Sequence, residues 1–573
     1  MVALAQMGKR RLTMQSVEIA SGTRAIRSLD WDRDRFDIEF GLQNGTTYNS
    51  FLIQGDRTAL VDTSHEKFRQ LYLDILTGLI DPNRIDYLIV SHTEPDHSGL
   101  VKDVLAMAPQ VTVVGSKVAI GFLENWVHEP FQKKIVKNGD RLDLGKGHVL
   151  EFVIAPNLHW PDTIFSYDTK TQILYTCDAF GMHYCDDHTF DEDLDLIEED
   201  FRYYYDCLMG PNARSVLSAI KRMNELPEIE TIATGHGPLL HHNVTELIGR
   251  YHQWSQEQTK AETTVAVFYL SNYGFSSRLV QAIAHGITKT GVAVEMMDLK
   301  SADTQEVKEL VSIATGLIIG TPPTGEAEKA SNAISTIIAA ANPKQYFGVF
   351  ESGGEDGESV YPLVNKFRDL GLNPAFPPIL VKETPTEATY HLCEEAGSEL
   401  GQLLSLHRNI KQIKAIDTDL EKALGRLSSG LYILTVQKGN VSSAMVASWV
   451  TQASFKPLGV TVAVAKDRAI ESLLHVGDRF VLNVLEEGNY QGLMKHFMKR
   501  FPAGADRFAN VKTYPANNDS PILADALAYM ECEVTSRMEC GDHWLIYSQV
   551  SVGRVSKPDA SAAVHHRKVG NHY

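Results

Sequence analysis

The chain has 573 residues, of which 43% are hydrophobic and 22% charged, as in ordinary soluble globular proteins. At about 150 residues per domain, this length predicts three or four domains. The net charge of −18 argues against a nucleic-acid or anionic-membrane partner. The six cysteines form no CxxC pair, no apolar run reaches transmembrane length, and the first residues lack the apolar segment of a signal peptide. We therefore expect a cytoplasmic protein in a reducing compartment.

The first domain is predicted to span about residues 20–260. Short apolar or alternating runs at 37–40, 48–53 and 59–62 are separated by turn residues and predict antiparallel strands. A helix is expected at about 67–79. The apolar run 86–91 then predicts a buried strand.

A cluster of possible metal ligands follows that strand directly. Within six residues the chain carries His92, Glu94, Asp96 and His97, in a predicted turn punctuated by Pro95 and Gly99. Two carboxylates and two imidazoles this close together repel each other or stay half-satisfied unless a cation lies among them. The stretch therefore indicates a metal site rather than a solvated loop.

Three later strands each end at another possible ligand. The predicted strands 149–154, 173–177 and 229–234 lead to His159, Asp178 and His236, respectively. Rigid strands that deliver ligands to one edge build a preorganised site. Seven ligands are too many for one tetrahedral ion and suit two, with Asp178 as the natural bridging carboxylate.

This pattern resembles the metallo-β-lactamase fold, an αββα sandwich whose hydrolases carry His-x-His-x-Asp-His. Here Glu94 stands in place of the second histidine, which gives a harder, more anionic site and favours iron over zinc. His-x-Glu-x-Asp-His is the mark of the flavodiiron proteins. The resemblance implies that His92, Glu94 and His159 bind one iron. It implies that Asp96, His97 and His236 bind the other and that Asp178 bridges them.

A second domain is predicted at about 262–410, after a polar run at 256–260 that is typical of a linker. Strands and helices alternate, which predicts a doubly wound parallel sheet with ligand at the strand C-termini. Three loops at strand ends resemble the FMN-binding loops of flavodoxin. Their candidate residues are Ser271, Asn272, Tyr273, Gly274, Phe275 and Ser276 in the first loop, Thr321, Pro322, Pro323 and Thr324 in the second, and Ser352, Gly353 and Gly354 in the third. The third loop lacks the aromatic residue that often stacks on the flavin there.

A third domain is predicted at about 415–573. A helix-prone segment at 417–427 precedes many short strands, which suggest a barrel. Segments 443–455, 541–544 and 565–573 resemble the split-barrel NAD(P)H:flavin oxidoreductases. The candidates for binding a second flavin, FMN or FAD, are Ser448, Thr451, Ser454 and Lys466. The sequence shows no fingerprint that separates NADH from NADPH.

Taken over nearly the full chain, the resemblance is to the three-domain flavodiiron proteins of oxygenic phototrophs. It implies an enzyme that passes electrons from NAD(P)H or ferredoxin through flavins to a di-iron site that reduces O2 to water, as a photoprotective electron sink. It also implies a head-to-tail homodimer or a heterodimer with a paralogous flavodiiron subunit. Three alternatives remain open: nitric oxide reduction, zinc-dependent hydrolysis, and a catalytically idle scaffold.

Overall fold

The structure is a computed structural model that describes residues 11–36, 40–271, 276–300, 302–321, 327–352, 360–382, 384–413 and 419–566. Its chain divides into two compact units. The first contains Met1–Glu262, Tyr269–Ser277 and Ala293–Ala302, and the second contains Thr263–Phe268, Arg278–Val292 and Asp303–Tyr573.

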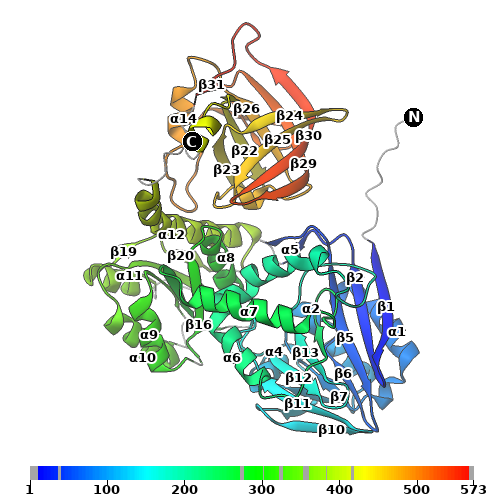
Figure 1. Cartoon of the computed structure of the whole chain (residues 1–573). Coiled ribbons are helices and arrows are strands. Elements are labelled where there is room, and N and C mark those ends of the chain that lie inside the picture. The colour runs from blue at the N-terminus through cyan, green and yellow to red at the C-terminus, as the bar shows by residue number, and fades with distance from the viewer. Residues whose placement is uncertain are drawn as a thin grey trace. The chain divides into compact units, whose positions relative to one another are not determined.

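Two mixed sheets form the first unit (Figure 1). The seven-stranded sheet has the order β1 (Leu12–Ala20), β2 (Thr23–Asp30), β5 (Thr46–Gln54), β6 (Thr58–Val61), β7 (Tyr87–Ile89), β8 (Thr112–Gly115) and β9 (Gln132–Ile135). The five-stranded sheet has the order β10 (Arg141–Gly145), β11 (His148–Ile154), β12 (Ile164–Asp168), β13 (Ile173–Cys177) and β14 (Thr231–Thr234). The antiparallel strands predicted at 48–53 and 59–62 are confirmed as β5 and β6. The strands β1 and β2, which were not predicted, extend this antiparallel part, whereas β6 to β9 pair in parallel. The predicted strand at 37–40 falls largely on residues 37–39, outside the described part.

Helices cover the outer faces of both sheets and complete a four-layer αββα sandwich. The first sheet packs against α1 (Arg69–Leu79), α3 (Val101–Met107) and α4 (Lys117–Val127). The second packs against α5 (Leu194–Tyr204), α6 (Ala213–Met223) and α7 (Val244–Thr259). A third apolar core, which includes Val61, Ile89 and Tyr175, lies between the two sheets. The apolar surface buried in these three cores is what stabilises a domain of this size.

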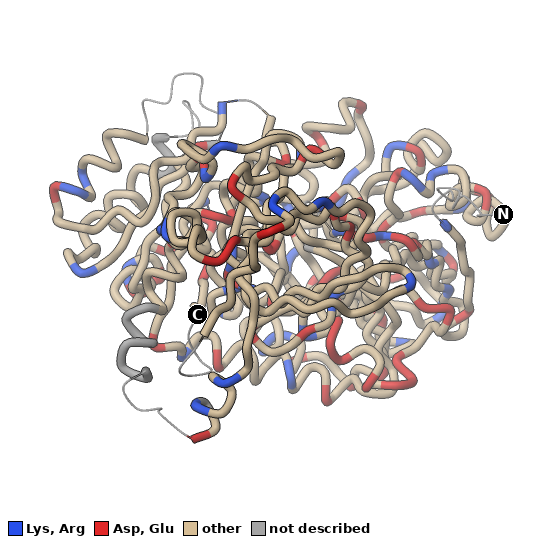
Figure 2. The backbone as a smooth tube through the Cα atoms, turned by 90° about the horizontal axis from the view of Figure 1, so that it is seen from above, with Lys and Arg blue, Asp and Glu red and all other residues tan. Residues whose placement is uncertain are grey.

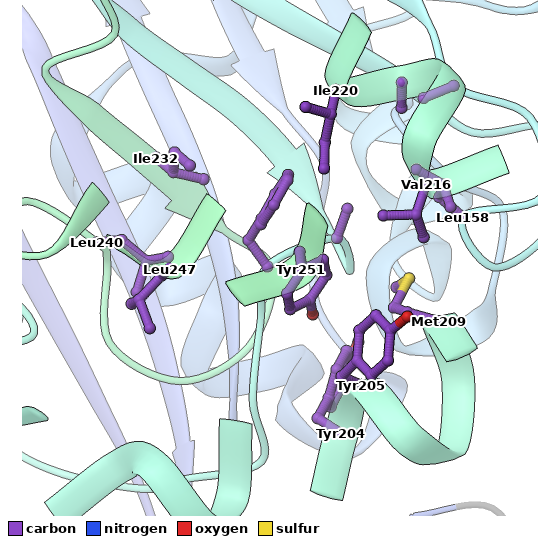
Figure 3. Packing of buried hydrophobic residues seen from close by; sticks show 14 of the residues in the cluster. Leu158, Tyr204, Tyr205, Met209, Val216, Ile220, Ile232, Leu240, Leu247 and Tyr251 are labelled. Carbon is purple, nitrogen blue, oxygen red and sulfur yellow. The ribbon is translucent and has the colours of Figure 1, made fainter. Parts of the chain in front are cut away.

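The polar run 256–260 is not the linker that its composition suggested, because α7 continues to Thr259. Gln and Glu are good helix formers. The buried side chains of Leu247, Tyr251 and Ser255 hold one face of this helix against the domain. Figure 3 shows Leu247 and Tyr251 of α7 in the same apolar cluster as Tyr205 and Val216. The polar residues at 256–259 therefore form the last turn of a packed helix.

The next sheet has the order β16 (Ala293–Asp298), β15 (Thr264–Tyr269), β17 (Gly316–Thr321), β18 (Tyr346–Ser352) and β19 (Asn373–Pro374), with β20 (Ile379–Val381) also paired to β18. The pairs β15–β17, β17–β18 and β18–β20 are parallel. The intervening helices are α8 (Ser276–Thr288), α9 (Thr304–Ile313), α10 (Ala327–Ala340), α11 (Val360–Asp369) and α12 (Glu387–Ile413). This is the predicted doubly wound, flavodoxin-like arrangement.

A seven-stranded antiparallel sheet forms the C-terminal part of the second unit. After α13 (Asp419–Leu424), its order is β23 (Val441–Ala447), β22 (Tyr432–Lys438), β26 (Arg479–Val484), β29 (Ala528–Cys540), β30 (His543–Val555), β25 (Leu458–Ala465) and β24 (Val450–Phe455). The sheet curls around an apolar core, as Figure 1 shows, and the predicted barrel is confirmed. A short helix, α14 (Gln491–Phe497), lies between β26 and β29 in the sequence.

Charged residues of both signs are interspersed along the backbone in Figure 2. All six cysteines are free, and five of them are buried. Among the described residues, no helix is both long and apolar enough to span a bilayer.

Candidate metal centre

Residues 92–99, which carry four of the predicted ligands, include one short helical turn. β7 ends at Ile89, and α2 (Pro95–Ser98) begins two residues after Thr93. Pro95 occupies the first helical turn, where its missing N–H costs nothing. The Ser98 hydroxyl donates to the carbonyl oxygens of Thr93 and Glu94 at 2.8 and 3.0 Å. The predicted turn is thus a short helix, which presents Asp96 and His97 from adjacent positions.

One group of donors gathers around a single carboxylate oxygen. The Nε2 atoms of His92 and His159 lie 3.2 and 2.9 Å from Oε2 of Glu94. Both Nε2 atoms also lie 3.4 Å from Oδ2 of Asp178. These four side chains can therefore offer their ligand atoms to one ion.

The other oxygen of Asp178 belongs to a second group. Its Oδ1 lies 2.9 Å from Nε2 of His97 and 3.3 Å from Nε2 of His236. The His236 nitrogen is also 3.3 Å from Oδ2 of Asp96. Asp178 thus directs one oxygen to each group, which is the arrangement of a carboxylate that bridges two ions. All seven predicted side chains converge here.

The chemistry of this donor set fits two cations. All seven side chains are buried, and three of them are carboxylates. Neither oxygen of Asp96, nor Oδ2 of Asp178, makes a well-formed hydrogen bond in the described part of the chain. Buried carboxylates without such partners are costly unless a cation compensates them. Three carboxylates and four imidazoles offer the oxygen-rich, hard environment that suits iron better than zinc.

In the metal-free fold, protonated histidines balance part of the negative charge of the buried carboxylates. Burial alone would lower the pKa of His159, but the neighbouring Glu94 raises it to about 9. Burial opposes protonation of His236 too, yet the nearby carboxylates of Asp178 and Asp96 raise its pKa to about 10. For Glu94, burial acts to raise the pKa, but the charge of His159 together with the hydrogen bonds from His159 and His92 lowers the pKa to about 2.

Metal binding is expected to release protons, and the metal affinity is expected to increase as the pH rises. His159 and His236 have raised pKa values in the metal-free fold, so their contribution to stability is fully present below pH 6.5. It is lost as the pH rises through about 9 to 10. Metal binding needs neutral imidazoles and displaces these protons. Calorimetric iron titration at pH 7 in buffers of different ionisation enthalpy should show release of at least about two protons per chain. No proton release at pH 7 would contradict the raised pKa values.

Residues outside the predicted set orient two of the histidines. Nδ1 of His92 lies 2.9 Å from Oδ1 of Asp162, whose other oxygen accepts from the Thr93 backbone N–H at 2.7 Å. Nδ1 of His236 donates to the Thr47 carbonyl oxygen at 2.7 Å. Such contacts fix the ring and the tautomer, and they leave Nε2 for the metal. Asp162 was not among the predicted residues, and its place three residues after His159 is only a weak signal.

His183 and Tyr204, which were not predicted from the sequence, also lie beside the centre. The His183 ring centroid is 4.7 Å from that of His236 and 4.9 Å from that of Tyr204. Burial, and then repulsion from His236, lowers the pKa of His183 well below its ordinary value. Its Nδ1 is 2.8 Å from the Thr46 hydroxyl oxygen. A neutral, hydrogen-bonded histidine here limits the space around His236.

Cys177 lies close to His97 and Asp178 but is a weaker candidate ligand. Burial raises the pKa of its thiol well above the ordinary value, and the thiolate is the form that binds metal. Its backbone has a left-handed φ of 54°, an uncommon conformation for a side-chain-bearing residue. Such strain is typical of functional sites, and here it bends the chain directly before Asp178.

The predicted flavin residues are only partly described. In the flavodoxin-like loops, positions 272–275, 322–326 and 353–359 lie outside the described part, which leaves Ser271, Ser276, Thr321 and Ser352 at their edges. In the barrel, Ser448 lines a cavity of about 530 Å³, and Lys466 lines another of about 490 Å³. Thr451 and Ser454 lie on β24 and line neither of these two cavities.

A carboxylate-rich donor set in an αββα sandwich, joined to a flavodoxin-like sheet and a flavin-reductase-like barrel, defines the class of flavodiiron oxidoreductases. Three family models match: ODP family beta lactamase at residues 46–237, flavodoxin at 267–397, and flavin reductase like domain at 424–571. Each model falls on one of the three folds described above.

The chain is 70% identical over 574 residues to a diflavin flavoprotein A 3 of Nostoc sp. PCC 7120, covering 100% of both chains. It is 66% identical to diflavin flavoprotein A 1 of Synechocystis sp. PCC 6803, covering 99% of both. A metal-soaked Flv1 flavodiiron core from Synechocystis sp. PCC6803 matches with a TM-score of 0.64 and 38% identity, over 69% of this chain and 99% of that one. The chain belongs to the three-domain flavodiiron proteins, the diflavin flavoproteins A of cyanobacteria.

Proposed function

We propose that the chain is a cytoplasmic NAD(P)H:oxygen oxidoreductase that reduces O2 to water and serves as a photoprotective electron sink. The observation that carries this proposal is the division of the two Asp178 oxygens between two donor groups. The first group is His92, Glu94 and His159, and the second is Asp96, His97 and His236. When bound, two irons and the flavins supply the redox chemistry. The protein residues hold the ions, balance their charge and orient the imidazoles.

We propose three domains, at about 20–260, 262–410 and 415–573, with FMN in the second and FMN or FAD in the third. The doubly wound sheet supports the FMN site. Ser271 follows β15, and Thr321 ends β17, the strand that pairs with β15. Ligands of such sheets bind outside the carboxyl ends of the strands, at the point where the strand order reverses. The donor is NAD(P)H or ferredoxin, and we expect a head-to-tail homodimer or a heterodimer with a paralogous subunit.

The test is one preparation of the full chain, in which iron, zinc and flavin are measured together with gas turnover. We expect about two irons and about two flavins per chain. Four-electron reduction consumes two NAD(P)H and two protons for each O2 and forms no peroxide. Turnover with NO would instead consume one NAD(P)H for two NO, and a higher rate with NO than with O2 would favour nitric oxide reduction. A preparation that contains zinc but neither iron nor flavin would instead support the zinc-dependent hydrolase.

A further inference from the structure

A cavity of about 530 Å³ lies within the second unit. This volume is in the range of small-molecule sites, about 300–1,000 Å³. Apolar and aromatic side chains line much of it, among them Met445, Ile470, Phe497 and Phe501. Arg468 lines it as well. The lining therefore combines a surface suited to a flat aromatic ring with a cation suited to a phosphate.

Two serines indicate that the cavity takes a polar ligand. Ser443 and Ser448 line it and are only 1% and 3% exposed. Their hydroxyl oxygens have no hydrogen-bond partner in the described part of the chain. Buried hydroxyls are normally paired, so both are expected to meet a partner supplied by a ligand.

One wall of the cavity comes from helix α12, which carries the lining residues Ser398, Gln402 and Ser405. This helix is fixed to α8 of the flavodoxin-like fold by contact of the two backbones. A Cβ atom at Gly286 would lie 2.0 Å from the Glu394 carbonyl oxygen, and one at Gly397 would lie 2.0 Å from the Ile283 carbonyl oxygen. Helices that approach this closely have no space to shift independently.

Buried polar contacts join the same helix to the barrel. Lys289, directly after α8, is ion-paired with Glu394 of α12 and lies 2.7 Å from Glu471 of the barrel domain. Glu471 also pairs with Arg537 of β29. Nε2 of Gln402 donates to the Asp467 carbonyl oxygen at 2.8 Å. Breaking a buried charge pair is strongly unfavourable, so these contacts hold α12 in place as a cavity wall.

We infer that helix α12 of the flavodoxin-like domain is an essential wall of the second flavin site, so the reductase-like domain retains its flavin only with the neighbouring domain of the same chain. This inference rests on the proposed function, which places a flavin in the third domain. The flavin ring would lie against the methionine and phenylalanine side chains, Ser443 and Ser448 would bond its polar atoms, and Arg468 would face the phosphate.

The test places a larger side chain on α12 so that it fills the cavity, and it uses the full-length chain. Gln402→Trp is expected to lower the flavin content from about two to about one per chain and to weaken binding of added FMN at the emptied site at least about tenfold. Leu403→Trp is the matched control, because it puts the same bulk at the next position of the helix, which does not line the cavity. It should keep about two flavins, with FMN affinity within about twofold of the parent.

Flavin counting, fluorescence titration with FMN and far-UV circular dichroism give the readout. Full occupancy and unchanged FMN affinity in Gln402→Trp would overturn the inference and leave the proposed function standing. A parent chain that holds one flavin and binds no further FMN would instead overturn the second flavin of the proposed function, and the inference with it. If Gln402→Trp does not fold, Ser405→Phe fills the cavity from the next turn of α12, with the same two outcomes.

Discussion

Replacing Asp178 by alanine is expected to abolish metal-dependent oxygen uptake while flavin reduction by NAD(P)H continues. Oδ2 of this side chain lies beside His92 and His159, and Oδ1 lies beside His97 and His236, so a single truncation removes a ligand from both donor groups. Loss of even a residue that only orients a ligand costs about 10–100-fold in metal affinity or activity, so turnover should fall at least about 100-fold.

Oxygen-electrode rates, iron content and stopped-flow flavin reduction measure the three quantities separately. Asp187→Ala is the matched control, because Asp187 is an exposed aspartate nine residues further along the chain. It should retain parent iron content and oxygen uptake. Undiminished oxygen uptake in Asp178→Ala would refute the proposed site.

The second large effect is expected from Glu94→His, which recreates the His-x-His-x-Asp-His pattern. The change removes one of three buried carboxylates and introduces a fifth imidazole next to His92 and His159, since Oε2 of Glu94 is 3.2 and 2.9 Å from their Nε2 atoms. A softer and less anionic donor set favours zinc over iron. We expect the purified variant to carry mainly zinc and to lose oxygen uptake by at least about 100-fold.

Metal analysis by mass spectrometry, after expression with iron and zinc both supplied, decides this prediction. Glu94→Asp keeps the carboxylate and serves as the comparison, with iron still in excess over zinc. A Glu94→His chain that binds iron at the parent level would show that this carboxylate does not set the choice of metal.

The donor set could be predicted from the sequence, because local rules place most of its members. His92, Glu94, Asp96 and His97 lie within six residues, and the fixed geometry of a strand end and one helical turn is enough to bring such neighbours together. His159, Asp178 and His236 follow strands that are recognisable from their apolar runs. The linker predicted from composition at 256–260 was wrong, because good helix formers there extend α7 to Thr259.

The groups that face these ligands could not be predicted from the sequence, because their positions depend on pairing between distant strands. Asp162 reaches His92 across 70 residues of sequence, and the Thr47 carbonyl reaches His236 across 189. Nothing local specifies such contacts. They follow from the register of two sheets packed face to face. The opposed directions of the two Asp178 oxygens, and the place of α12 in the wall of the barrel cavity, arise in the same way from packing over long sequence separations.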